Sequence, residues 1–218
     1  MTSGTIFAFA VYLIGMLLIG LICYRLTKNL SDYILGGRGL NPAVAALSAG
    51  ASDMSGWLLL GLPGAVYASG MNQIWIGIGL VIGAYLNWQF VAKRLRIYTE
   101  VAKDSITIPD YLENRFDDRS HILRIISAVV ILLFFTFYVS SGLVAGGVLF
   151  EETFDLPYQW ALWIGMLVIV SYTFLGGFLA VSWTDFVQGI LMFLALVVVP
   201  MIAISNLGGW DQVTDTVG

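Results

Sequence analysis

Six stretches of the sequence are long and apolar enough to cross a lipid bilayer. A transmembrane helix needs roughly 20 mostly apolar residues, because the hydrocarbon core of a bilayer is about 30 Å thick. The six stretches cover residues 6–24, 42–67, 74–91, 122–150, 160–181 and 186–207. Backbone polar groups in the hydrocarbon region must be hydrogen-bonded within the protein, and a helix achieves this within one segment. We therefore predict an all-α, multi-pass membrane protein with six transmembrane helices.

The composition argues against several classes of protein. Charged residues make up 11% of the 218 residues and the mean hydropathy is +0.88, whereas about 25% of residues are charged in an ordinary soluble domain. A net charge of −4 and the lack of a basic, aromatic-rich patch argue against a nucleic-acid partner. No nucleophile, general base and orienting group occur together, so the sequence does not predict an enzyme.

All ten Lys and Arg residues fall in two segments, which a six-helix topology places on the same side of the membrane. These segments are 25–38 and 93–124, and the connections at 68–73, 151–157 and 208–218 carry only acidic or uncharged residues. Loops rich in Lys and Arg stay in the cytoplasm. We therefore predict a protein of the cell membrane with both termini outside.

One carboxylate, Asp53, lies near the middle of the second apolar stretch, within "LSAGASDMSGWLLLGLPG". Burying an ionised aspartate at the centre of a bilayer costs at least a few kcal/mol, and such residues usually mark ion or proton pathways. The alternative is structural. Ser48, Ser52 and Gly56 would form a stripe of small residues on one helix face, which favours tight helix packing. Asp53 would then be satisfied by a hydroxyl on a neighbouring helix.

The segment "AGASDMSG" around Asp53 favours a break in the helix, because Gly, Ser and Asp are all poor helix formers. A break frees backbone carbonyls, which must find other partners inside a membrane. A cation such as Na⁺ is one such partner. Secondary transporters use broken helices to bind substrate and coupling ion near the midplane of the bilayer. The sequence thus indicates an ion site at a helix break, with tight packing as the alternative.

The basic segment between the third and fourth apolar stretches is predicted to contain a short surface helix. In "TIPDYLE" (107–113), Thr107 is a candidate N-cap facing Asp110, and Pro109 lies in the first turn. Ile108, Tyr111 and Leu112 would share one face of this helix. We expect a connecting helix that lies on the membrane surface.

Three long segments closely resemble the solute:sodium symporter family, and within it the proline symporters. They are "DYILGGRGLNPAVAALSAGASDMSGWLLLGLPGAVY", "LRIISAVVILLFFTFYVSSGLVAGG" and "FLGGFLAVSWTDFVQ". The resemblance implies two inverted repeats of five helices, preceded by one extra helix. Residues 1–41 would hold the extra helix and a cytoplasmic loop, and residues 42–218 the first repeat. The second repeat is absent from the chain.

The resemblance implies import of L-proline or a similar small zwitterionic amino acid, driven by Na⁺ as the coupling ion. It assigns the backbone carbonyls of Ala51 and Met54 to the sodium site. Asp53 would be needed for sodium coupling by shaping the broken segment. Asp185 matches an acidic residue near the inner sodium exit. Its alternative role is structural, since Ser182 and Asp185 have capping-box spacing at the start of the sixth stretch.

The same resemblance places the start of the substrate region at Ser55, Gly56 and Trp57. Tyr138 matches a residue that faces the substrate cavity, although its position also suits an ordinary packed aromatic. Arg38 matches a functionally sensitive arginine, although it also fits the general excess of positive charge on the cytoplasmic side.

Other interpretations concern the missing second repeat and the type of protein. The chain is expected to be the N-terminal half of a longer transporter. A half-transporter that dimerises in antiparallel fashion disagrees with the strong charge bias, because dual topology needs a weak bias. The alternatives from other classes are a transporter-like membrane sensor or binding module, and a membrane subunit that does not transport.

Overall fold

The computed structural model describes residues 3–54, 57–58 and 60–217, and these residues form helices joined by short connections, without a strand. The all-α prediction is therefore confirmed. The elements are α1 (Ser3–Leu26), α2 (Leu30–Leu35), η1 (Gly36–Arg38), α3 (Pro42–Met54), α4 (Gly61–Ser69), η3 (Met71–Gln73), α5 (Ile74–Leu86), η4 (Asn87–Ala92), α6 (Lys93–Val101), α7 (Ile108–Phe116), α8 (Ile122–Phe154), α9 (Tyr158–Asn206) and α10 (Trp210–Val217).

Four helical stretches in the described part of the chain are long and apolar enough to cross a membrane. They are Ser3–Leu26, Met71–Val101, Ile122–Phe154 and Tyr158–Asn206. The predicted second span is divided between α3 and α4, and neither piece reaches that length. The predicted fifth and sixth spans both lie within α9.

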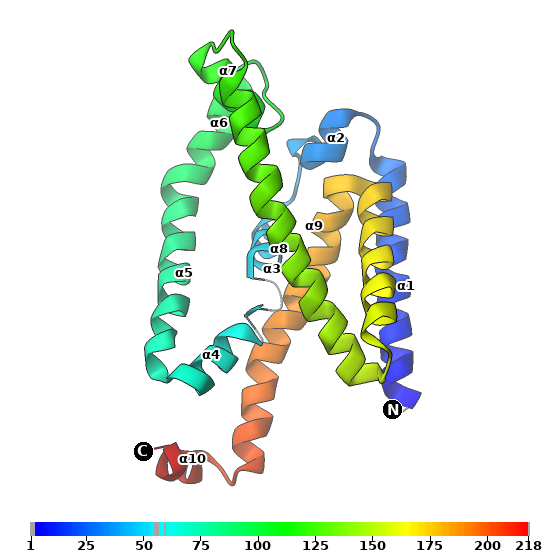
Figure 1. Cartoon of the computed structure of the whole chain (residues 1–218), viewed down its shortest axis with the longest axis vertical. Coiled ribbons are helices and arrows are strands. Elements are labelled where there is room, and N and C mark those ends of the chain that lie inside the picture. Colours follow the sequence, from blue (N-terminus) through cyan, green and yellow to red (C-terminus); the bar gives the residue numbers. More distant parts are fainter. Residues whose placement is uncertain (1–2, 55–56, 59, 218) are drawn as a thin grey trace.

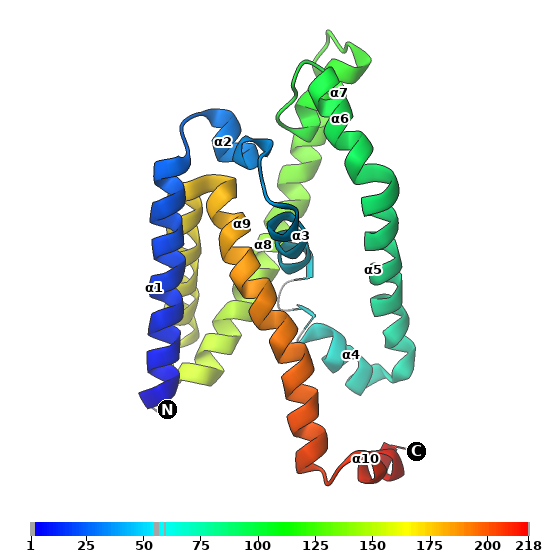
Figure 2. The ribbon, with the colours of Figure 1, turned by 180° about the vertical axis from the view of Figure 1, so that it is seen from behind.

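The chain reverses direction inside α9 at Gly177, whose backbone is not helical (φ 57°, ψ −149°). Figures 1 and 2 show the segment before Gly177 running beside α1 and the segment after it returning through the centre of the molecule. We call these the first and second segments of α9. A Cβ at Gly177 would lie 2.5 Å from the carbonyl oxygen of Tyr33, so only glycine fits. The sequence predicted the boundary between the fifth and sixth spans at 182–185, and this is wrong. Hydropathy placed the boundary there because these residues are polar, but the fold buries Ser182, Thr184 and Asp185 within a continuing helix.

Close packing joins α1 to α9 through small residues. A Cβ at Gly20 would lie 2.9 Å from Tyr172 Cβ, and one at Gly176 would lie 3.0 Å from Cys23 Cβ. Small residues allow the backbones of membrane helices to approach closely. The α1 helix, the predicted extra helix, therefore packs closely against the first segment of α9.

The short helix predicted in the basic segment is present as α7, and its position on the membrane surface stays a prediction. Its N-cap Thr107 accepts a hydrogen bond from the Asp110 N–H at 3.2 Å, and proline occupies the first turn. Tyr111 is the buried residue of this helix. In Figure 1, α2, α6 and α7 lie at one end of the molecule and both termini at the other. The basic segments are thus gathered at one end.

The α5 helix stands apart from the rest of the molecule in both views (Figures 1 and 2). It packs against its chain neighbours α4, η3 and η4, and none of its residues is buried. Large apolar side chains are exposed along α5 and along most of α8. Such surfaces need to be covered by lipid or by further protein.

Candidate functional site

The helix break predicted around Asp53 is present in the structure, because α3 ends at Met54 and α4 begins at Gly61. Ala51 and Met54 lie in the last turn of α3, and the Met54 carbonyl accepts a hydrogen bond from Leu58 N–H at 3.3 Å. The predicted substrate residues Ser55 and Gly56 lie outside the described residues. The last carbonyls of a helix lack intrahelical partners and carry its partial negative charge. This end of α3 is therefore suited to bind a cation.

The carboxylate of Asp53 is exposed on this last turn. It makes no hydrogen bond or ion pair with any residue that the structure describes. Thus the hydroxyl partner expected for tight packing is not found among the described residues. Trp57 follows the break and packs on α4, where a Cβ at Gly61 would lie 2.5 Å from the indole Cδ1.

Tyr138, on α8, binds the backbone at the end of α3. Its hydroxyl is near the carbonyl oxygens of Ser52 (2.7 Å) and Asp53 (3.1 Å), to which it donates. These carbonyls belong to the turn that a helix end leaves unpaired. Tyr138 is thus placed beside the break, in contact with the backbone that flanks Asp53.

Asp185, on the second segment of α9, contacts two side chains of α3. Its carboxylate accepts hydrogen bonds from the hydroxyls of Ser48 (2.9 Å) and Ser52 (2.5 Å), and the side chain is almost fully buried. The predicted capping box of Ser182 and Asp185 is wrong, because both residues lie inside a continuing helix. The Ser182 hydroxyl is buried without a hydrogen-bond partner among the described residues.

A second polar contact anchors the same part of α9 to α1. The side-chain amide of Gln188 donates to the Tyr12 hydroxyl at 2.7 Å. Gln188 lies about one helical turn beyond Asp185, so this contact fixes the helix face that Asp185 turns toward α3. Sequence reasoning missed Tyr12 and Gln188. The only available signal was a glutamine among apolar residues in "FVQGILMF".

Arg38 does not join this cluster. It lies at the end of the molecule that holds α2, α6 and α7, where its guanidinium pairs with Asp104 and lies 3.5 Å from the Glu100 carboxylate. It also donates to the Ser105 carbonyl at 2.9 Å. The structure thus brings Ala51, Asp53, Met54, Trp57, Tyr138 and Asp185 to the broken segment, and places Arg38 elsewhere.

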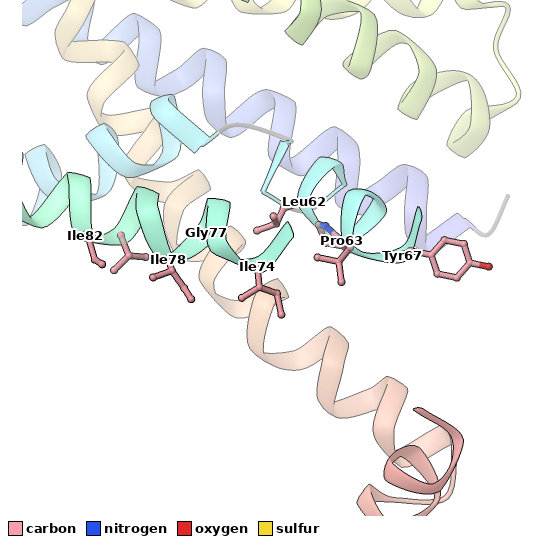
Figure 3. Close-up of a pocket in the computed structure, with 9 residues that line it drawn as sticks. Leu62, Pro63, Tyr67, Ile74, Gly77, Ile78 and Ile82 are labelled. Carbon is pink, nitrogen blue, oxygen red and sulfur yellow. The ribbon is translucent and has the colours of Figure 1, made fainter. Parts of the chain in front are cut away.

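An apolar groove of about 800 Å³ lies between α4 and α5 (Figure 3). Its lining offers almost no oxygen ligands, and the Tyr67 ring points away from the rest of the lining in this view. It is therefore unsuited to an ion. The residues that line it are Leu62, Pro63, Val66, Tyr67, Ile74, Gly77, Ile78, Val81 and Ile82.

The described residues include no group of three or more His, Cys, Asp or Glu side chains placed to hold a metal ion. An ion at the break would therefore depend on backbone carbonyls and hydroxyls. Alkali and other hard cations bind such oxygen donors, as in the broken helices of transporters.

Comparisons with known proteins point to one family. The sequence model described as "Sodium:solute symporter family" matches residues 33–217. The chain is 60% identical over 204 residues to the sodium/proline symporter of Escherichia coli (strain K12), covering 94% of this chain and 41% of that protein. It is 61% identical over 194 residues to the high-affinity proline transporter PutP of Bacillus subtilis (strain 168), covering 89% and 41%. No solved structure matches the chain.

A further relative is the osmoregulated proline transporter OpuE of Bacillus subtilis (strain 168). The identity is 53% over 209 residues, which cover 96% of this chain and 42% of that protein. The chain therefore spans about two fifths of the length of these relatives.

Proposed function

Because the chain belongs to the sodium:solute symporter family, we propose that it is the N-terminal part of a Na⁺-coupled symporter that imports L-proline or a similar small zwitterionic amino acid. The family consists of transporters and not of enzymes, as the sequence predicted. Residues 1–41 contribute the extra helix and its cytoplasmic loop. Residues 42–218 contribute the first five-helix repeat.

The observation that carries this proposal is the break between α3 and α4 beside Asp53. Na⁺ binds to the carbonyls of Ala51 and Met54, at the end of α3 that carries partial negative charge. The Met54 carbonyl has a second lone pair available besides the one that Leu58 uses. The exposed Asp53 carboxylate adds a full negative charge next to these donors and favours a cation over a neutral ligand.

The substrate lies on the other side of the break in this proposal. Its region begins at Ser55, Gly56 and Trp57, and Tyr138 lines it from α8. The hydrogen bonds from Tyr138 to the carbonyls of Ser52 and Asp53 support this arrangement, because they tie α8 to the segment that holds the ion. A movement of Tyr138 on substrate binding would then displace the backbone that carries the proposed sodium ligands.

The missing partner of this half is the second repeat of the same transporter. Two features support this: no residue of α5 is buried, and the Asp53 carboxylate is exposed. Both leave surfaces that further helices of the transporter would cover. The remaining apolar surface faces the lipid bilayer. In the cell membrane the end with α2, α6 and α7 lies in the cytoplasm and the N-terminus lies outside. The gathering of the basic segments at one end supports this orientation.

The test is uptake by the complete symporter that carries this segment, purified and reconstituted in liposomes. An inward Na⁺ gradient should drive accumulation of labelled proline, and a K⁺ gradient of the same size should not. Residues 1–218 alone should catalyse no uptake, since they supply half of a midplane site. Proline binding without uptake would instead identify a sensor, and neither binding nor uptake would identify a subunit without transport function.

The orientation has its own test in single-cysteine variants within residues 93–124. A membrane-impermeant maleimide should label them in inside-out vesicles and leave them unlabelled in intact cells. Labelling from outside the cell would overturn the proposed topology.

A further inference from the structure

The Arg38 side chain is largely withdrawn from water although it lies at an end of the molecule. Only 13% of the side chain is exposed, against 73% for its partner Asp104. The guanidinium is held by the Asp104 carboxylate, by Glu100 at 3.5 Å and by the Ser105 carbonyl at 2.9 Å. A buried cation needs such partners, because losing water without compensation is unfavourable. The contact is therefore a specific one that joins η1 to the turn between α6 and α7.

The backbone is left-handed on both sides of this contact. Arg38 has φ 55°, and Lys103 and Asp104 have φ 55° and 54°. Non-glycine residues hold this conformation only where their surroundings fix it, and such residues gather at functional and switch segments. Both residues of the ion pair thus adopt a backbone conformation that the surrounding structure has to hold.

The Arg38 side of the contact is tied to α9 and to the start of α3. The Tyr33 hydroxyl, on α2, donates to the Phe174 carbonyl at 3.3 Å, just before the reversal at Gly177. After η1 the chain turns directly into α3, whose first turn is capped by the Asn41 side chain at 2.9 Å from Ala43 N. A displacement of Arg38 would therefore be transmitted to α3, the helix that ends at the break.

The other side of the contact is a rigid turn. Ser105 is 4% exposed, its hydroxyl bonds to the Ala102 carbonyl, and it accepts a hydrogen bond from the Asn114 side chain at 2.9 Å. This hydrogen bond ties the turn to α7, which packs on α8. Among the described elements, α2 and η1 do not pack closely against α6 or α7. Arg38 is thus a main link between the two sides at this end.

We propose that Arg38 forms a latch with Asp104 and the Ser105 carbonyl, which holds the cytoplasmic end closed over the start of α3 and opens once in each transport cycle. This rests on the proposed transport function. The latch is reversible because Asp104 and Glu100 are half to mostly exposed, and exposed ion pairs contribute little free energy. Arg38 is a positioning residue in this proposal, since it acts through α3 and touches neither ion nor substrate.

The test measures opening without measuring transport. A Ser105→Cys variant of the complete symporter carries a nearly isosteric, buried thiol on the residue whose carbonyl Arg38 contacts, and the native Cys23 is buried and serves as a silent background. The probe is a membrane-impermeant maleimide applied to inside-out vesicles, and the readout is the rate of labelling. Adding Na⁺ and proline together should raise this rate, because the cycle then visits the opened state.

Charge reversal identifies the residues that close the latch. Arg38→Glu and Asp104→Arg, each added to Ser105→Cys, should raise the labelling rate on the order of tenfold by shifting the population toward the open state. The swapped pair Arg38→Glu/Asp104→Arg should restore at least half of the protection. Arg119→Glu is the matched control, because it makes the same change at the same end in a side chain that is 92% exposed. It should leave the rate unchanged.

Three outcomes would overturn the latch: unchanged labelling in the single variants, no protection in the swapped pair, or no effect of Na⁺ with proline. Failure of the proposed function is detected separately, as absent proline uptake by the unmodified symporter. Loss of folding in the single variants would appear as labelling of Cys23 in the same samples. In that case the conservative variant Arg38→Lys replaces Arg38→Glu, and faster labelling of the Ser105→Cys thiol without labelling of Cys23 is required to uphold the proposal.

Discussion

The buried carboxylate of Asp185 on α9 accepts a hydrogen bond from the hydroxyl of Ser48 on α3 at 2.9 Å. Ser52, one turn further along α3, donates to the same carboxylate oxygen. The two donors lie on one face of the helix that ends at Met54. These two hydrogen bonds therefore fix which face of α3 packs against the second segment of α9.

The first prediction concerns this contact. Ser48→Ala removes one donor to a buried carboxylate and should lower the free energy of unfolding by about 1–3 kcal/mol. Asp185→Asn should lower the free energy of unfolding by a similar amount. The double variant should lower the free energy of unfolding by less than the sum of the two single effects. Residues in one hydrogen-bond network are coupled by about 0.5–3 kcal/mol. The measurement is thermal unfolding of the purified protein in detergent.

The control for this cycle is Ser171→Ala, whose exposed hydroxyl bonds, within the described part of the chain, only to the Leu167 carbonyl of its own helix. It should change stability by a few tenths of a kcal/mol. Strict additivity of Ser48→Ala and Asp185→Asn would show that the contact does not hold α3 in place.

The second prediction concerns the reversal of α9. Gly177→Ala places a Cβ 2.5 Å from the Tyr33 carbonyl oxygen, at a φ of +57°. Strain of this kind costs on the order of 1–3 kcal/mol before the clash is counted. We expect little folded protein in the membrane and a lowered unfolding temperature. Gly165→Ala is the matched control, because nothing lies within 4 Å of its added Cβ, and normal yield of Gly177→Ala would argue against the reversal.

The third prediction concerns acid stability at the start of α8. The pKa of Asp118 is lowered by hydrogen bonds from the Ser120 side chain and then from the Leu123 backbone N–H. A carboxylate with a depressed pKa in the folded protein stabilises it fully above the unfolded pKa of about 4. This stabilisation is lost as the pH falls through the lower folded pKa.

The measurement is the difference in unfolding temperature between the unmodified protein and Asp118→Ala as a function of pH. The difference should be constant at neutral pH and should shrink below about pH 4. A difference that grows toward acid would show that the sign assigned to Asp118 is wrong.

Local features of the fold could be predicted from the sequence, because they depend on a few adjacent residues. The break after Met54 follows from Gly, Ser and Asp in one helical turn. The N-cap Thr107 and the proline after it likewise define the start of α7. Both signals act within one or two turns of the chain and need no knowledge of the tertiary structure.

Long-range features could not be predicted in the same way. The reversal at Gly177 lies in an apolar run, so hydropathy shows no minimum there. The contact of Asp185 with Ser48 depends on which face of α9 meets α3, and this rotation is set partly by Gln188 and Tyr12 on a third helix. The capping-box spacing of Ser182 and Asp185 was therefore a misleading local signal. The roles of Ala51, Asp53, Met54 and Tyr138 in binding stay predictions.

The last prediction concerns Asp53 in the complete symporter. Asp53→Asn, which is nearly isosteric, should weaken activation by Na⁺ far more than it changes the amount of protein in the membrane. The Asp53 carboxylate has no partner in the described part of the chain, so its removal breaks no contact with those residues. The charge itself matters, because it lies on the turn whose carbonyls are proposed to bind the ion. One charge 4 Å away contributes on the order of 4 kcal/mol at an effective dielectric constant of about 20, and less at greater distance.

A loss of about 1.4 kcal/mol already means tenfold weaker binding of Na⁺. Tight packing around Asp53, the structural alternative, predicts lower expression with unchanged Na⁺ dependence among the surviving molecules. The decisive measurement is the initial rate of proline uptake against Na⁺ concentration, normalised to the transporter present in the membrane. Asp117→Asn, which removes the same charge from an exposed position near the start of α8, should leave the half-saturating Na⁺ concentration unchanged. If Asp53→Asn also leaves it unchanged at a near-normal maximal rate, Asp53 is not part of the sodium mechanism.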